Sequence, residues 1–457
     1  MQNKFKFSVP ATVLLVAVVT VAIILGIIFI PNYNKEKENL SFGNLTAYAV
    51  SEAKYPETVD YPDIKSPNFY EEETAWENRR LELLKDYNSK TMNTDDFFKN
   101  SLPVFLSGSK GENKVYSPLN MYFALGMLAE ITDENSRNEI LKALSVNDIE
   151  ELRKTSNALF KANYYNDKRV KSILANSLWL NDKVKFNKET LEKISDVYYA
   201  SSYSGEMGSK EFDGAIATWI NENTKNLLKN QTGDIKTTKY TIISLVSTIY
   251  FKACWTDKFN EIATEEQTFY AENDEYECDF MNMSRGGTVY YGKDFSSARL
   301  SLDGSGYMYF ILPDKNSSVD EILRGDDLVR VISSGDSWQN KTQATVNYSV
   351  PKFDVSASMD LEDGLKELGI KDVFSRLESD FSPLTSEKNL AVSSAQHSAR
   401  VMIDEDGCTG AAYTMFAVEG MSAPPPTIID FTLDRPFIFA VTSSTGDTLF
   451  AGVVNKP

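Results

Sequence analysis

The side chain with the most catalytic potential in this chain is its single histidine, His397. Any mechanism in which an imidazole activates a serine or cysteine would have to use it. His397 lies inside the stretch NLAVSSAQHSARVMI, residues 389–403, whose alternation of apolar and polar residues is typical of a strand. We interpret it as a buried, hydrogen-bonded histidine, so no catalytic residue is predicted. A hydrolase that depends on His397 is kept as an alternative.

Other groups that could support chemistry are equally scarce. The three cysteines are an odd number, which excludes a disulfide framework, and no histidine and cysteine ligands stand at the close spacing of a zinc site. The adjacent carboxylates Glu265 and Glu266, like Asp326 and Asp327, are interpreted as solvated surface. No glycine-rich phosphate loop or dinucleotide motif is present. The sequence therefore predicts no metal and no cofactor, and a protein that is not an enzyme.

The composition is that of a folded, acidic protein. Of the 457 residues, 42% are hydrophobic and 12% are aromatic, which is enough to build a sizeable core. The net charge of −18, without any cluster of Lys or Arg, repels nucleic acids and sulfated polysaccharides. We predict no nucleic-acid partner and no heparin-like cofactor, and we expect a monomer.

The N-terminus carries a long apolar segment. Residues 8–30 contain no charged side chain and are long enough to cross a bilayer. Lys4 and Lys6 precede them, which favours an N-terminus inside the cell and the rest of the chain outside. We predict an uncleaved anchor over residues 1–30, and hence a single-pass protein of the cell membrane with an extracellular domain. The alternative is a signal segment cut near AYA, residues 47–49, which would give a secreted protein.

Beyond the anchor the chain divides into two parts. Residues 31–92 are polar and acidic and are predicted to form a stalk or linker. Residues 93–457 show no repeat or internal linker and are predicted to form one domain. One of its early helices is expected to begin with Ser117 as the cap and Pro118 in the first turn. Strand-like runs dominate after about residue 240, which favours an α+β fold over a doubly wound parallel sheet.

The stretch IDEDGCTGAAYTMFAVEGMSAPPPT, residues 403–427, combines a glycine-led run of small residues, an apolar run and three prolines. No proline stands between Gly407 and Met421, so every backbone N–H group in that interval can join a β-ladder. One face of such a strand would be small or apolar and uncharged, and would consist of Cys408, Gly410, Ala412, Thr414, Phe416 and Val418. The stretch is therefore competent to become a buried strand.

The closing segment FTLDRPFIFAVTSSTGDTLFAGVVNKP, residues 431–457, resembles the C-terminal signature of the serpins, a family of serine protease inhibitors. The resemblance extends over nearly all of residues 93–457, through segments such as YSPLNMYFALGMLAE (116–130), STIYFKACW (247–255) and VPKFDV (350–355). It implies a serpin fold, with N-terminal helices packed on a large mixed β-sheet, smaller sheets and an exposed reactive-centre loop. Together with the apolar N-terminus, it leads us to expect a membrane-anchored serpin of prokaryotic origin.

The resemblance also assigns positions in the loop. The reactive-centre loop would run from Glu405 to about Thr427, and Met421, fourteen positions after Gly407, would precede the attacked bond Met421–Ser422. An unbranched apolar Met suits the shallow apolar pockets of elastase-like and subtilisin-like proteases. The hinge, where insertion into the sheet would begin, comprises Glu405, Gly407, Cys408, Thr409, Gly410, Ala411 and Ala412.

Two supporting regions follow from the same resemblance. Trp255 matches the tryptophan of the breach, where the loop first enters the sheet. His397, Ser117 and Pro118 match the shutter beneath the opening strands. Ser247 stands where the family usually has an asparagine that hydrogen-bonds the histidine, so we expect this network to be weakened or rerouted.

These assignments predict a suicide-substrate inhibitor of extracellular serine proteases. The target would be trapped as a covalent acyl complex when the cleaved loop inserts into the main sheet. The alternative is a non-inhibitory serpin that acts as a surface binding or carrier protein.

Overall fold

The structure of the chain is a computed structural model that describes residues 45–89, 92, 94–109, 111–233, 235–393, 395–408 and 427–457. Gly43–Pro457 form one compact unit. Met1–Phe42 form a separate unit, which lies outside the described residues.

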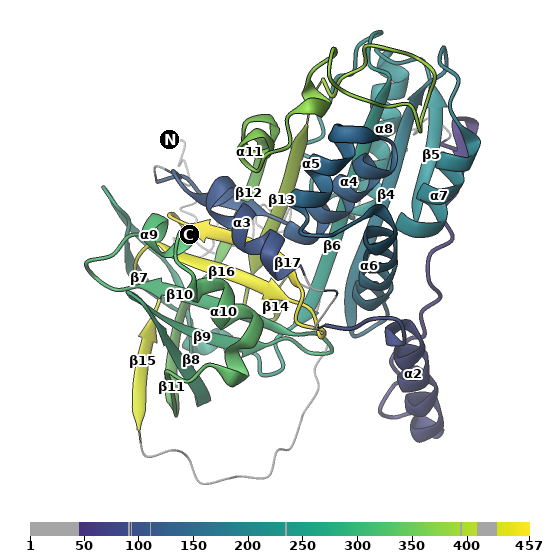
Figure 1. Ribbon diagram of the computed structural model, residues 1–457. Coiled ribbons are helices and arrows are strands. Elements are labelled where there is room, and N and C mark those ends of the chain that lie inside the picture. The colour runs from purple at the N-terminus through teal and green to yellow at the C-terminus, as the bar shows by residue number, and fades with distance from the viewer. Residues whose placement is uncertain are drawn as a thin grey trace, which may run out of the picture. The chain divides into compact units, whose positions relative to one another are not determined.

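The first of two β-sheets carries the hinge. Within the described residues it has eight strands in the order β1-β5-β4-β6-β14-β13-β12, with β3 paired to β4 (Figure 1). Strands β4 and β5 run parallel, whereas the other neighbours in this sheet are antiparallel, so the sheet is mixed. Its strands are β1 (Ala49–Ser51), β3 (Tyr165–Asn166), β4 (Val170–Asn181), β5 (Ala200–Gly205), β6 (Ile243–Cys254), β12 (Phe353–Asp360), β13 (Gln396–Ile403) and β14 (Gly407–Cys408).

The second sheet is built mainly from the C-terminal half of the chain. Its order is β15-β11-β8-β9-β10-β16-β17-β2, with β7 paired to β8. Its strands are β2 (Lys114–Tyr116), β7 (Glu265–Tyr270), β8 (Glu275–Gly292), β9 (Phe295–Ser301), β10 (Tyr307–Pro313), β11 (Lys341–Pro351), β15 (Ile428–Thr432), β16 (Phe437–Thr442) and β17 (Thr448–Val454). The strand runs predicted from the sequence around β10, β16 and β17 are confirmed.

Most of the longer helices precede the strand-rich half of the chain. In Figure 1, α4, α5 and α6 lie close to β4 and β6 of the first sheet. The helices are α2 (Phe69–Leu84), α3 (Asp95–Leu106), α4 (Pro118–Glu130), α5 (Glu134–Ala143), α6 (Ile149–Asn163), α7 (Lys188–Tyr198), α8 (Lys210–Asn223), α9 (Val319–Leu323), α10 (Asp327–Ser334) and α11 (Glu362–Glu367), with short 3₁₀ turns η1 (Leu45–Ala47), η2 (Glu261–Ala263), η3 (Gly335–Ser337) and η4 (Asp372–Phe374).

Helix α4 is the central helix of the core. Its cap is Ser117, whose hydroxyl accepts the backbone N–H of Asn120 over 3.2 Å, and Pro118 occupies the first turn, as predicted. Nearly every side chain of α4 is buried, because the helix contacts both β6 of the first sheet and β17 of the second. The helices and two sheets together form the predicted α+β fold.

Residues 45–89 differ from the stalk that was expected over residues 31–92. They contain η1, β1 and α2 and belong to the same compact unit as the domain. The physical reason is that this acidic segment also carries aromatic side chains that find partners on the domain. Tyr48 packs edge-on against Phe212 of α8, with ring centroids 5.1 Å apart, and Tyr55 stacks on Tyr164 at 5.5 Å.

The expected position at the cell membrane requires correction. Across the part of the chain that the structure describes, no helix is both long enough and apolar enough to span a bilayer. The predicted anchor over residues 1–30, with its apolar segment 8–30, falls outside the described residues.

Candidate functional site

The hinge begins with a tight turn that reverses the chain between β13 and β14. One carboxylate oxygen of Asp404, Oδ1, accepts the backbone N–H groups of Asp406 at 3.0 Å and Gly407 at 3.1 Å. The N–H of Asp404 donates in turn to the carbonyl of Gly407 over 3.1 Å. Because the short side chain of aspartate mimics a backbone turn, this residue fixes the direction in which the loop leaves β13.

Strand β14 lies between β6 and β13 and is antiparallel to both. Cys408 pairs with Ile403 of β13 and with Ala253 of β6, while Gly407 pairs with Cys254. Among the described residues no ladder joins β6 directly to β13. The two strands therefore run in the same direction, are bridged by two residues at one end, and direct backbone hydrogen-bonding groups toward the strip between them.

Two hinge residues are adapted to this narrow position. A Cβ atom on Gly407 would lie 2.3 Å from the carbonyl oxygen of Ala253 and 2.6 Å from Cα of Cys254, so only glycine fits against the backbone of β6. The side chain of Cys408 is 2% exposed, and burial, with a smaller contribution from Asp404, raises the pKa of its thiol to about 12. At neutral pH this thiol stays protonated and packs as a small apolar group.

Glu405 joins the turn to the second sheet through a charged network. Its Oε1 atom lies 2.8 Å from Nζ of Lys352 and accepts the hydroxyl of Thr264 over 2.7 Å. Burial acts to raise the pKa of Glu405, but the hydrogen bonds from Lys352 and Thr264 outweigh it and lower the pKa. A second ion pair, Lys258 to Asp406 at 2.6 Å, holds the other side of the turn.

Trp255 immediately follows β6 and lies directly under this turn. Its indole N–H donates to the carbonyl of Asp404 over 2.8 Å, and its backbone N–H donates to the carbonyl of Asp406 over 3.0 Å. The ring is 2% exposed and packs edge-on against Phe259. The predicted breach residue thus holds the hinge turn through both its side chain and its backbone.

Of the predicted shutter residues, His397 and Ser117 are in contact, near the start of β13. The Nε2 atom of His397 accepts the backbone N–H of Ser117 over 3.0 Å, and burial lowers the pKa of this imidazole to about 4. His397 is therefore neutral at physiological pH and accepts rather than donates through Nε2. The hydroxyl of Ser247 is buried without a hydrogen-bond partner among the described residues, so the histidine is held by α4 instead of by β6.

The remaining predicted loop residues lie outside the described residues. They are Thr409, Gly410, Ala411, Ala412, Met421 and Ser422. The chain resumes at Thr427, followed by β15, which runs parallel to β11 at the edge of the second sheet.

Sequence reasoning missed the cations that hold the hinge. Lys352 and Lys258 stand far from the loop in the chain, and nothing in their neighbouring residues indicates a partner at position 405 or 406. A possible signal was the pair of carboxylates in Glu405 and Asp406, because half-buried carboxylates require cationic or N–H partners.

Comparisons with known proteins agree with this geometry. The family model described as Serpin (serine protease inhibitor) matches residues 93–457. Alpha-1-antiproteinase 2 of Equus caballus is 29% identical over 360 residues, which cover 76% of this chain and 82% of that protein. Serpin B3 of Homo sapiens is 28% identical over 383 residues, which cover 76% of this chain and 95% of that protein.

Solved structures show the same fold. The native state of tengpin, a thermophilic serpin, matches with a TM-score of 0.70 and 25% identity over 81% of this chain and 95% of that chain. Human thyroxine-binding globulin in complex with thyroxine also matches with a TM-score of 0.70, at 23% identity, over 82% of this chain and 99% of that chain. At that identity the second match concerns the fold alone.

Within the described residues, the site is a helix-covered mixed sheet in which the two-residue strand β14 lies between β6 and β13, and no other ladder joins those two strands. The chain belongs to the serpin family. That family consists mainly of inhibitors of serine proteases and is not a class of enzymes.

Proposed function

We propose that this protein is a suicide-substrate inhibitor of serine proteases with elastase-like or subtilisin-like preference. The observation that carries the proposal is β14, which among the described residues occupies one end of the strip between β6 and β13. The residues that follow Cys408 contain no proline before Met421, so the rest of the strip has a suitable occupant in the same chain.

The register of β14 predicts which residues of β6 and β13 each inserted residue would pair with. Continued from Cys408, the strand would set Thr414 opposite both His397 of β13 and Ser247 of β6. Its even-numbered side chains would face the buried side, as Cys408 does, and these are the small or apolar uncharged ones. The inserted loop would therefore supply a threonine hydroxyl beside the buried hydroxyl of Ser247, which has no hydrogen-bond partner among the described residues.

The chemistry requires only that the protease begin its ordinary reaction. Its serine would attack the carbonyl carbon of Met421, the amine of Ser422 would leave, and an acyl ester would join Met421 to the enzyme. Fourteen inserted residues at about 3.3 Å each would then carry the tethered protease on the order of 45 Å along the sheet. New ladder bonds at about 0.5–1.5 kcal/mol each, with buried apolar area, give on the order of 10 kcal/mol to distort it.

The test is to mix the protein with pancreatic elastase and, separately, with subtilisin. We expect an SDS-stable complex and a peptide cut between Met421 and Ser422 by mass spectrometry. Ala412→Pro removes a backbone donor that the inserted strand needs, so this variant should be cut without forming a complex. The matched variant Pro425→Ala, beyond the scissile bond, should inhibit like the parent.

Two results would contradict the proposal. The first is clean cleavage of the parent protein without any complex. The second is a nicked protein that melts no higher than the intact one, since insertion must stabilise the cleaved form. Both results together would favour the non-inhibitory carrier.

A further inference from the structure

The N-terminal segment, residues 45–89, is attached at one end to the edge of the first sheet. Strand β1 pairs antiparallel with β5, with Ala49 opposite Tyr203 and Ser51 opposite Ser202. Just beyond β1, the N–H of Ala53 donates to the hydroxyl of Ser201 over 3.0 Å. This end of the segment therefore moves with β5 and with β4, to which β5 is paired.

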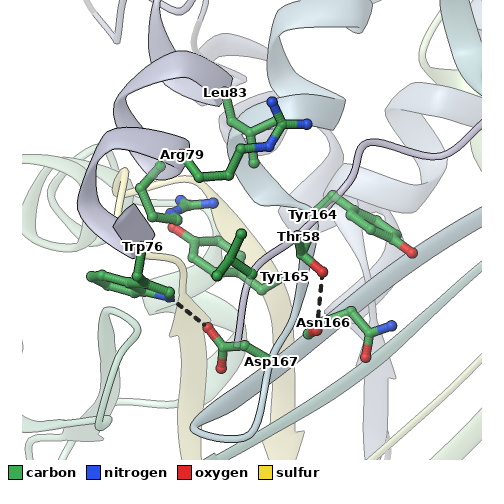
Figure 2. Close-up of a pocket in the computed structure, with 10 residues that line it drawn as sticks. Thr58, Trp76, Arg79, Leu83, Tyr164, Tyr165, Asn166 and Asp167 are labelled. Atoms are coloured by element: carbon green, nitrogen blue, oxygen red, sulfur yellow. Dashed lines mark hydrogen bonds between the residues drawn. The ribbon is translucent and has the colours of Figure 1, made fainter. Parts of the chain in front are cut away.

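The middle of the segment is fastened to the turn that joins β3 and β4. Figure 2 shows the hydroxyl of Thr58 donating to the carbonyl of Asn166, at 3.0 Å, and the indole N–H of Trp76 in α2 donating to the carboxylate of Asp167, at 3.1 Å. The guanidinium of Arg80, also in α2, stacks on the ring of Tyr165. The cavity that these groups enclose holds only about 10 Å³, roughly the space of one water molecule.

The far end of the segment reaches the second sheet. The hydroxyl of Tyr87 donates to both carboxylate oxygens of Asp447, at 2.9 and 3.0 Å. Asp447 lies next to the start of β17, is 3% exposed and also accepts the side-chain amide of Asn163 in α6 over 2.9 Å. A buried carboxylate with such partners is a firm attachment point, because an unmet charge there would be strongly unfavourable.

The attachments at β5 and at the β3–β4 turn lie on one side of the strip that the loop would fill, and the attachment at Asp447 lies on the second sheet. Strands β1, β5, β4 and β6 lie on one side of that strip, and β13 and β12 lie on the other. The second group is tied to the second sheet, since β12 and β13 contact β2, which pairs with β17. Seating a full strand between β6 and β13 separates the two groups by about one strand spacing, 4.7–4.9 Å.

We propose that residues 45–89 are a strap that holds the first sheet closed and sets the rate at which β6 and β13 separate. The strap joins β5, on one side of the strip, to Asp447 of the second sheet, which contacts β12 and β13 through β2, so its contacts must loosen before the strip widens. Its consequence for inhibition rests on the proposed function, whereas the restraint itself belongs to the intact molecule and is measurable without any protease.

The experiment is amide hydrogen exchange on the intact full-length protein and two variants. Tyr87→Phe removes the hydroxyl that binds Asp447, and Trp76→Phe removes the donor to Asp167. We expect amides of β5, β6 and β13 to exchange about tenfold faster in each variant, because each loses one hydrogen bond to a charged group. Exchange in β9 and β10 of the second sheet should stay unchanged, which separates opening of the first sheet from general loss of stability.

The matched control is Tyr70→Phe, which removes a hydroxyl from the exposed face of the same helix, where Tyr70 is 82% exposed. Its amides should exchange at the same rates as in the parent. Unchanged exchange rates in β5, β6 and β13 of Tyr87→Phe and Trp76→Phe would contradict the strap proposal. An equal increase of the exchange rates in β9 and β10 would contradict it too. The proposed function is tested separately, and it would be contradicted if no complex forms with elastase or subtilisin.

Discussion

Nζ of Lys352 lies 2.8 Å from Oε1 of Glu405, which ties the turn between β13 and β14 to the residue that directly follows β11. The substitution Glu405→Lys would reverse this charge and set two ammonium groups against each other. Because a hydrogen bond between charged groups contributes about 1.5–3 kcal/mol, we expect the free energy of unfolding to fall by about that amount. Urea unfolding measures the change. Glu362→Lys, which reverses the exposed pair of Glu362 with Lys366, is the matched control and should change stability by less than about 1 kcal/mol.

Gly407 touches the backbone of β6, so enlarging it should displace β14. In Gly407→Ala the new methyl group would meet the Ala253 carbonyl, and neither backbone can move without breaking the pairing. We expect more cleaved protein and fewer complexes per molecule of protease, measured by titration of residual protease activity. Gly286→Ala in β8, where nothing lies within 4 Å of the added methyl group, should leave the titration unchanged. An unchanged titration for Gly407→Ala would contradict the role of β14.

Thr414 should contribute to the stability of the cleaved form but not to that of the intact protein. If it inserts beside Ser247 and His397, Thr414→Val removes one buried hydrogen bond, of about 1 kcal/mol, from the cleaved form. The rise in melting temperature on nicking should then shrink by a few degrees, while the intact variant melts like the parent. Thr409→Val, on the opposite face of the inserted strand, is the control. Equal effects from both substitutions would mean that the register differs.

His397 should make the native state less stable in acid. Its folded pKa of about 4 lies below the unfolded value of about 6.5, so the unfolded chain binds the proton more tightly. The stabilisation is present above about pH 6.5 and is lost as the pH falls toward 4, by about 2 kcal/mol between about pH 7.5 and 5. His397→Gln keeps an acceptor for Ser117 without this titration. In urea unfolding at several pH values, the free energy of unfolding of that variant should fall less steeply toward acid pH.

Asp95, at the start of α3, should make the native state more stable in acid, in contrast to His397. Burial and, to a lesser extent, the charge of Asp447 raise its pKa to about 6. A carboxyl with a raised folded pKa contributes stability below its unfolded pKa, and that stability is lost as the pH rises through 6. Acidification from about pH 7.5 to 5 should therefore add about 1 kcal/mol, which Asp95→Asn would remove. The control is Asp96→Asn, at an exposed position on the same helix, and its stability should vary with pH as that of the parent does.

Local patterns predicted much of the fold. The run at Tyr307–Pro313 is apolar and flanked by turn residues, and it forms β10 with those bounds. Ser117 and Pro118 were predicted to start a helix because capping depends on a few adjacent residues, and they do start α4. The strand competence of residues 407–421 was predicted because their small, proline-free character is likewise a local property, whereas the hinge residues were assigned by the resemblance to serpins.

Other features were set only when distant parts of the chain met. The acidic composition of residues 31–92 predicted a stalk, but Tyr55 and Trp76 in that segment find partners on the domain, and no local pattern indicates them. The same holds for the shutter, where His397 is held by a residue 280 positions away and the Ser247 hydroxyl has no hydrogen-bond partner in the described part of the chain. The sequence by itself determined most of the helices and strands of the domain and predicted a segment competent to form a strand, because periodicity, capping and backbone donors are local. Tertiary structure alone decided which charges, aromatic rings and hydroxyls meet, because those contacts depend on how distant elements pack.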